Sequence, residues 1–312
     1  MNNVFAKLNS CIRYMRYLES MGIANAMFFV WRKVVPQKSQ MSNYLSMFAG
    51  VGLEIGGPSS FFNSNGAMPI YEVANTIDNV TFSKETKWEG ELQAGRSYHF
   101  HKLKGPGNQY ILEASELSGM ASETYDFVIS SHMLEHTSNP IRALKEWQRV
   151  LKANGKLLLV LPHRDGTFDH LRPVTDISHM VEDFDTDAGE GDSTHFDEIL
   201  SLHDLKRDVA QESRADFQTW IRNNHINRGA HHHVFDSFVA AELVNFSEFK
   251  IIAIEAIRPH HICVLSEKVP AAGVLDNSQF LQVNSKYLIQ SPFKTDRLRS
   301  QTRLKGKRPT NS

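Results

Sequence analysis

The sequence predicts an α/β fold with a Rossmann-like, mostly parallel sheet and an antiparallel last strand. Three observations support this prediction. Short apolar runs alternate with amphipathic stretches through the middle of the chain, and strands separated by helices form a parallel sheet covered on both faces. The run at 156–161 is apolar after its first lysine, as buried parallel strands are. The last two apolar runs are separated only by Arg258-Pro259-His260, which is too short for a crossover helix.

This pattern places strands at 51–55, 69–73, 109–112, 125–130, 156–161, 250–257 and 261–265. The first of them ends in the Gly56-Gly57-Pro58 turn. Asn139 and Pro140 begin the helix before the fifth strand, with Asn as the N-cap and Pro at the first helical position. Gly155 stands where the C-terminal cap of that helix belongs. A second amphipathic helix at 238–244 precedes the closing pair of strands.

The chain divides into three parts: an N-terminal helical extension at 1–45, a main domain at 46–268 and a basic tail at 269–312. The apolar stretch at 21–31 has about half of the ~20 residues that span a bilayer. We expect the extension to pack on the domain or form an oligomer contact, and the alternative is an amphipathic helix at a membrane surface. From Lys286 onward the tail has eight basic residues against one acid, so we expect it to be disordered.

Composition excludes several classes of protein. Lys and Arg total 34 against 35 for Asp and Glu, so a globally basic nucleic-acid binder is not expected. The two cysteines, Cys11 and Cys263, are far apart in sequence and form no disulfide framework or cysteine zinc site. They fit a reducing compartment, and we expect a cytoplasmic protein. Histidine is abundant, at 15 residues.

Candidate ligand-binding residues follow the predicted strands. Ligands of open α/β sheets bind at the carboxyl ends of the strands, which is where Gly56 and Gly57 follow Glu54. A Gly-Gly-Pro turn is also common without a ligand. After the fourth strand, the spacing of His132, Glu135 and His136 could place three metal ligands on one helical face. A cofactor-shaping role is the alternative, and we predict no metal there.

The histidines gather in an insertion at 166–232, placed between the fifth strand and the last helix. It also carries a mixed set of acids, and its residues of interest are Asp192, His195, Asp197, His203 and Asp204, followed by His231-His232-His233 and Asp236. Such a set suits zinc, manganese or magnesium. The insertion could cover the active site, bind a metal or supply a catalytic base.

The ordered motifs resemble those of class I S-adenosylmethionine-dependent methyltransferases. The segments that carry the resemblance are 54–57, 110–117, 125–136, 149–162 and 235–268. Leu134-Glu135-His136, followed by Arg149-Val150-Leu151 and Gly155, is characteristic of the type 11-like subgroup. The histidine run after an acidic segment resembles methyltransferases associated with bacterial polysaccharides. The family's sheet also ends in an antiparallel strand.

The resemblance implies S-adenosylmethionine as the cofactor. Its predicted binding residues are Glu54, Gly56 and Gly57 near the methionine end, Glu72 or Asp78 at the ribose, Glu113 and Ala114 at the adenine, and His132 beside the sulfonium. Pro58 and Ser60 stand where the family has its second and third glycines. That departure removes one backbone N–H donor.

We therefore expect a methyltransferase that acts on oxygen, with a sugar, glycan or other small polar acceptor and no specific nucleic acid. The Asn/Asp-Pro-Pro-aromatic motif of base methylation is absent after Ser130, and the insertion is polar. An imidazole with an ordinary pKa of ~6.5 suits the base that an acceptor hydroxyl needs. The candidates are His163, which follows the fifth strand, then His232 and His136; a solvated loop histidine is the alternative for His163.

Two other classes of function remain open from the sequence. One is a metal-dependent hydrolase that uses the His/Asp insertion, which leaves the ordered methyltransferase motifs unexplained. The other is a non-catalytic interaction module that keeps the fold, supported only by the altered glycine motif. Fold alone does not separate these classes, because function depends on the site.

Overall fold

The computed structural model describes residues 19, 38–86, 90–208, 210, 211 and 213–302. The helical extension predicted at 1–45 lies mostly outside these residues. Its described end enters a 3₁₀ helix, η1 (Gln40–Phe48), whose Met41 and Phe48 are buried. Within the described ranges, no helix combines the length and apolar character needed to cross a bilayer.

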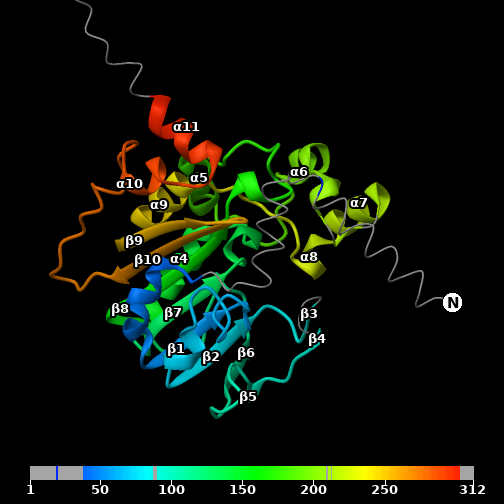
Figure 1. Cartoon of the computed structure of the whole chain (residues 1–312). Coiled ribbons are helices and arrows are strands. Elements are labelled where there is room, and N and C mark those ends of the chain that lie inside the picture. The colour runs from blue at the N-terminus through cyan, green and yellow to red at the C-terminus, as the bar shows by residue number, and fades with distance from the viewer. Residues whose placement is uncertain (1–18, 20–37, 87–89, 209, 212, 303–312) are drawn as a thin grey trace, which may run out of the picture.

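An eight-stranded sheet forms the centre of the molecule, in the order β5-β6-β2-β1-β7-β8-β10-β9 (Figure 1). Its strands are β1 (Val51–Ile55), β2 (Thr76–Thr81), β5 (Gly95–Tyr98), β6 (Gly107–Ile111), β7 (Tyr125–Ser131), β8 (Leu151–Pro162), β9 (Phe249–Ile257) and β10 (His261–Lys268). Strands β6, β2, β1, β7 and β8 pair in parallel. Strand β10 is antiparallel to both of its neighbours. The predicted fold class and the antiparallel last strand are therefore confirmed.

The strand predicted at 69–73 is wrong, because this segment forms a short helix, α3 (Ile70–Val73). The second strand is β2, at Thr76–Thr81. Polar residues inside it concealed the strand pattern, since Asp78 and Asn79 are buried. Asn79 stays buried because its side chain bonds both backbone groups of Gly57 and the Gln109 side chain, each at 3.0 Å.

The helix predicted before the fifth strand is α4 (Pro140–Val150), and Asn139 caps it by accepting from the Arg142 N–H. Its C-terminal end differs from the prediction, because β8 begins directly at Leu151 and Gly155 lies within that strand. The amphipathic helix before the closing strands is α9 (Ser237–Phe246).

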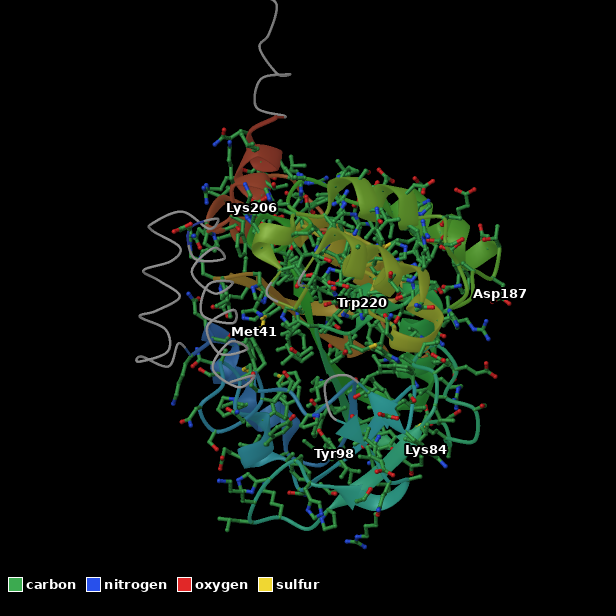
Figure 2. The ribbon with its side chains drawn as sticks, turned by 90° about the vertical axis from the view of Figure 1, so that its right-hand side faces the viewer. Met41, Lys84, Tyr98, Asp187, Lys206 and Trp220 are labelled. Carbon is green, nitrogen blue, oxygen red and sulfur yellow. The ribbon has the colours of Figure 1, made fainter. Side chains whose placement is uncertain are left out.

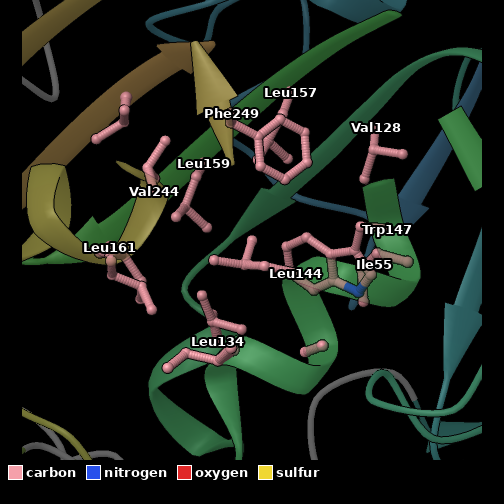
Figure 3. Close-up of a cluster of buried hydrophobic side chains, with 14 of the residues drawn as sticks. Ile55, Val128, Leu134, Leu144, Trp147, Leu157, Leu159, Leu161, Val244 and Phe249 are labelled. Atoms are coloured by element: carbon pink, nitrogen blue, oxygen red, sulfur yellow. The ribbon is translucent and has the colours of Figure 1, made fainter. Parts of the chain in front are cut away.

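The main core lies between the sheet and helices α4 and α9. Trp147 of α4 packs with Val128, Leu159 and Phe249 of the strands (Figure 3). Each such side chain contributes about 1.5–3 kcal/mol when it is fully buried. The Trp147 indole N–H also donates to the Ala114 carbonyl at 2.9 Å. The core thus fixes the position of the chain immediately after β6, where a ligand contact is predicted.

The insertion forms a small helical layer beside the sheet, with its own core. Its helices are α5 (Ile177–Asp185), α6 (Phe196–Leu202), α7 (Arg214–Arg222) and α8 (Asn224–Asn227). The core consists of Ile199, Phe217, Ile221 and Ala230. Figure 2 views the molecule from this side, with Trp220 of α7 above and Tyr98 of β5 below.

The tail predicted to be disordered is ordered in the structure as far as it is described. It forms α10 (Lys286–Ile289) and α11 (Lys294–Thr302), while 303–312 lie outside the described residues. The single acid of this basic segment, Asp296, is fully buried. It accepts from the Ser237 N–H at 3.1 Å and from the Ser291 hydroxyl at 2.6 Å. These bonds attach the tail to the start of α9, which composition alone does not reveal.

Candidate active site

A cavity of about 1160 Å³ opens at the carboxyl ends of β1, β6 and β7. Its walls come from the turn after β1, the loops after β6 and β7, and the insertion. Small-ligand pockets commonly measure about 300–1,000 Å³. The cavity is therefore large enough for a nucleoside-sized cofactor together with a second molecule.

The glycine turn after β1, predicted to contact the cofactor, lies against this cavity. Gly56 has a φ of 78°, which favours glycine, and a Cβ atom on it would lie 2.7 Å from Met133 Cγ. A Cβ atom on Gly57 would lie 2.2 Å from Glu54 Cδ. The Gly56 and Gly57 N–H groups donate to the Val80 carbonyl and to Asn79 Oδ1. The turn thus allows close approach of a ligand, while these two donors are engaged inside the protein.

Glu54 lies beneath the turn and does not line the cavity. Its buried carboxylate accepts from the hydroxyls of Tyr71 at 2.8 Å and Tyr98 at 2.5 Å, and from the Ser59 N–H at 3.1 Å. Burial, together with the Glu54 charge, raises the pKa of both tyrosines well above the ordinary value, so both stay protonated and donate. Glu54 therefore holds the turn in shape from below, and its contact with the cofactor stays a prediction.

Neither Glu72 nor Asp78, the two acids predicted to bind the ribose, lines the cavity, and this assignment stays a prediction. Glu72 precedes β2 on α3, and its half-exposed carboxylate lies 3.4 Å from His101 Nε2. Asp78 is the third residue of β2, short of the carboxyl end, and accepts from the Asn108 N–H and the Tyr125 hydroxyl. The acids that do line the cavity are Glu91, Glu113, Glu135, Glu190 and Asp208.

Glu113 and Ala114, the residues predicted to contact the adenine, follow β6 and line the cavity. Glu113 pairs with Arg228 at 2.5 Å, and Arg228 also lies 3.3 Å from Glu190 Oε2. Arg228 thus joins the end of β6 to the insertion. Burial raises the pKa of Glu190 to about 7, although the Arg228 charge opposes this shift. A carboxyl group in this range titrates near neutral pH.

His132, the residue predicted to lie beside the sulfonium, follows β7 and also lines the cavity. Its φ of 54° turns the backbone at the point where the strand ends. Its Nε2 lies 2.7 Å from His261 Nδ1, and its Nδ1 lies 3.6 Å from Glu135 Oε1. The His132 ring also contacts His260, another lining residue.

His136 lies beside Glu135 in the short 3₁₀ helix η2 (Leu134–His136). Burial lowers its pKa to about 4, so the imidazole is neutral at neutral pH. Its ring centre lies 4.7 Å from that of His231. The two histidines and Glu135 can bring one ligand atom each within 4.8 Å of one another, which could hold a divalent cation.

His231 forms a buried pair with Asp169 and lines the cavity. Its Nδ1 lies 2.5 Å from Asp169 Oδ2, and Arg172 donates to the other carboxylate oxygen at 2.9 Å. Burial alone would lower the pKa of His231, yet the Asp169 charge holds it above its ordinary value. Arg172 is itself fully buried and also donates to the His231 and His232 carbonyls. This arrangement fixes an imidazole of raised basicity at the cavity wall.

The structure does not bring His163 or His232 to the cavity, and their role as catalytic bases stays a prediction. His163 is fully buried, with its ring stacked on Phe293 and its Nε2 3.1 Å from Asp296 Oδ1. His232 is buried in the insertion, where its Nε2 lies 3.2 Å from Asn224 Nδ2. The C-terminal tail covers His163. Side chains alternate in direction along the histidine run, so His232 points away from the cavity.

Sequence reasoning missed Asp169, Arg172 and Glu190, and it singled out the histidine run without finding which member faces the cavity. His231 is that member. The run itself was the available signal. Its partners are 62 and 59 residues away, so no local spacing connects them.

Comparison with known families matches residues 92–159 to the model described as a methyltransferase domain. The match begins in the loop between β4 (Gly90–Glu91) and β5 and ends in β8. It therefore includes Glu113, Ala114, His132 and His136. No curated protein matches the chain.

Solved structures give distant likenesses. A methyltransferase from Aquifex aeolicus shows 12% identity over 76% of this chain and 96% of that one, with a TM-score of 0.37. One from Methanosarcina mazei shows 14% identity over 70% and 92%, with a TM-score of 0.40. The 1,6-didemethyltoxoflavin-N1-methyltransferase of Burkholderia thailandensis shows 12% identity over 86% and 91%, with a TM-score of 0.40. Likenesses at this distance say nothing about the acceptor.

The strand order reproduces a parallel sheet with an antiparallel last strand. The cavity lies at the carboxyl ends of its strands, which is where this type of sheet binds ligands. Together with the matched methyltransferase domain, these findings support a class I S-adenosylmethionine-dependent methyltransferase with S-adenosylmethionine as its cofactor.

Proposed function

We propose that this enzyme methylates a hydroxyl group of a small polar acceptor such as a sugar or glycan. The observation that carries the proposal is the His231–Asp169 pair at the wall of the cavity. S-adenosylmethionine supplies an electrophilic methyl group when bound. A hydroxyl acceptor then needs a base for its proton, which general-base catalysis provides.

The cofactor would occupy the side of the cavity formed by the sheet. The Gly56-Gly57 turn permits close approach of its methionine end. Leu112, Ala114 and Met133 line the cavity beside this turn and offer an apolar surface for a purine ring. His132 follows β7 and also lines the cavity, and it is proposed to lie beside the sulfonium of the cofactor.

His231 is the proposed base. Asp169 occupies its Nδ1, which leaves Nε2 as the atom that accepts a proton. The carboxylate stabilises the imidazolium that results and holds the ring in orientation. Arg172 fixes the carboxylate in turn. His136 packs against the His231 ring and is proposed to help position the acceptor.

The polarity of the insertion side supports a polar acceptor. Arg207, Asp208 and Glu190 of the insertion line the cavity, and His260 lines it from the turn between β9 and β10. Such groups suit an acceptor with several hydroxyls, and an apolar lipid or quinone would leave them without water. The resemblance to polysaccharide-associated methyltransferases points to the same acceptor class.

Transfer of labelled methyl groups from S-adenosylmethionine tests the proposal. The purified full chain would be screened against sugars, sugar phosphates and oligosaccharides, with apolar phenols and amines as comparison sets. We expect transfer to a sugar hydroxyl, and a turnover lowered about 100-fold or more in His231→Ala. His170→Ala is the matched control, because His170 pairs with Asp204 at 2.9 Å outside the cavity. Transfer only to amines or carbon, or full activity of His231→Ala, would contradict it.

A further inference from the structure

A second group of histidines lies in the insertion, away from the cavity. His179 and Asp183 are four residues apart on α5, His195 precedes α6, and His233 precedes α9. None of the four lines the large cavity. Each can bring one ligand atom within 4.8 Å of all the others. The group therefore joins three segments of the chain through side chains that metals favour.

The distances in this group fit a tetrahedral ion. His179 Nε2 lies 3.1 Å from His195 Nε2, and His233 Nε2 lies 2.9 Å from Asp183 Oδ2. His179 Nε2 is 3.6 Å from the same carboxylate oxygen. Bonds of about 2.0–2.1 Å from zinc to nitrogen or oxygen place neighbouring ligands about 3.3 Å apart. The three observed distances lie on both sides of that separation. Small side-chain rotations would therefore bring the four ligand atoms into a tetrahedral arrangement.

We propose that His179, Asp183, His195 and His233 form a structural zinc site. Three imidazoles and one carboxylate are a donor set that zinc favours. Calcium and magnesium require mostly oxygen ligands, which this group does not offer. Four protein ligands also leave no open position for a substrate, which makes the site structural rather than catalytic.

An ion can reach the group from outside. A surface cavity of about 440 Å³ is lined by His179 and Asp183 together with the loop that contains Gly189, Gly191 and Thr194. His233 is fully buried at the inner side, while the side chain of His179 is 39% exposed. The proposed zinc ligands thus lie at the buried end of a cavity that is open to solvent.

The site would hold one wall of the active-site cavity in place. The loop between α5 and α6 carries Glu190, which lines that cavity and pairs with Arg228. Asn139, the N-cap of α4, also donates to the Asp183 carbonyl at 3.1 Å. A metal that joins α5 to His195 and His233 would fix both ends of this loop. We infer that zinc preorganises the cavity without touching the acceptor.

Metal titration of the full chain tests the site without cofactor or acceptor. The protein, stripped with a chelator, would be titrated with Zn²⁺ by calorimetry, and its melting temperature measured with and without the ion. We expect one tight site per chain and a melting temperature raised by about 5 °C. In His179→Ala the affinity should fall about 100-fold or more, and the thermal shift should disappear. His179 is partly exposed, so this variant is expected to fold.

Three controls locate the ion. His170→Ala also removes one histidine, but this residue lies outside the proposed zinc site. The variant should therefore bind zinc as the parent does. His136→Ala tests the cavity group of Glu135, His136 and His231 and should retain the tight site. X-ray absorption of the zinc-loaded parent should show four nitrogen or oxygen ligands and no sulfur.

Zinc binding by His179→Ala with parental affinity would overturn the proposal, as would loss of the tight site in His136→Ala alone. Absence of tight binding in the parent would overturn it as well. These readouts are independent of methyl transfer. The structural site and the proposed function therefore fail or succeed separately.

Discussion

Asp169 accepts the Nδ1–H of His231 at a distance of 2.5 Å, across 62 residues of sequence. Both side chains are at least 91% buried, with exposures of 3% and 9%. The pair connects the first loop of the insertion to its last segment, directly at the cavity. Its stability and its chemistry are therefore coupled, because the same carboxylate that orients the imidazole also fixes the insertion through Arg172.

Asp169→Asn should lower kcat/KM about 100-fold or more while leaving S-adenosylhomocysteine affinity within a few-fold. A base works when it is neutral, so the raised pKa of His231 places the rise of activity above its ordinary value of ~6.5. Loss of the carboxylate charge should move that rise to lower pH. The pH dependence of kcat/KM measures both effects. Asp204→Asn removes the carboxylate that pairs with His170 outside the cavity and should leave the profile unchanged. An unshifted profile in Asp169→Asn would exclude the base role.

Glu190 should make the protein less stable as pH rises toward neutrality. Its folded pKa is raised by burial to about 7, while an unfolded Glu titrates near ~4.3. The folded state thus binds more protons between these values, and stability falls by roughly 3–4 kcal/mol across that window. Urea unfolding of the parent and of Glu190→Gln at several pH values measures this. The glutamine variant should lose most of the dependence, and an equal dependence in both proteins would contradict the prediction.

Gly56→Ala should weaken S-adenosylhomocysteine binding about 10-fold or more and cost about 1–2 kcal/mol of stability. The φ of 78° is unfavourable for alanine, and the new Cβ would lie 2.7 Å from Met133 Cγ. Gly119→Ala is the matched control, since its φ is 85° and no atom lies within 4 Å of the added Cβ. Gly119→Ala therefore measures only the free-energy cost of placing alanine at a positive φ, without a steric clash. Calorimetric titration and thermal melting separate the two, and equal affinity in parent and Gly56→Ala would remove the turn from the cofactor site.

His163→Ala should destabilise the protein by about 3 kcal/mol and leave methyl transfer intact below the melting temperature. The change leaves the buried Asp296 carboxylate without its imidazole partner at 3.1 Å. This pair also links the tail to the start of α9 through Ser237. Limited proteolysis should then release the tail more readily. A stable variant with turnover lowered 100-fold would instead restore the catalytic role first predicted for His163.

Local sequence determined much of the fold and part of the site. The apolar runs of β7 and β8, the Asn139 cap and the short connection before β10 predict their elements because each signal lies within a few residues. Gly56, Glu113, Ala114, His132 and His136 were placed at the cavity by their positions after strands. The carboxyl ends of parallel strands share one edge, so position along the chain alone brings these residues together.

Tertiary structure decided the remaining assignments. Asp78 and Asn79 lie in a strand whose polar side chains are satisfied by distant partners, so β2 had no apolar pattern to find. Which histidine of the run faces the cavity depends on how the insertion packs around Arg172. His163 is covered by a tail more than a hundred residues later. Buried polar groups form hydrogen bonds with whichever groups the folded chain places beside them. The spacing of residues along the sequence does not predict these long-range contacts.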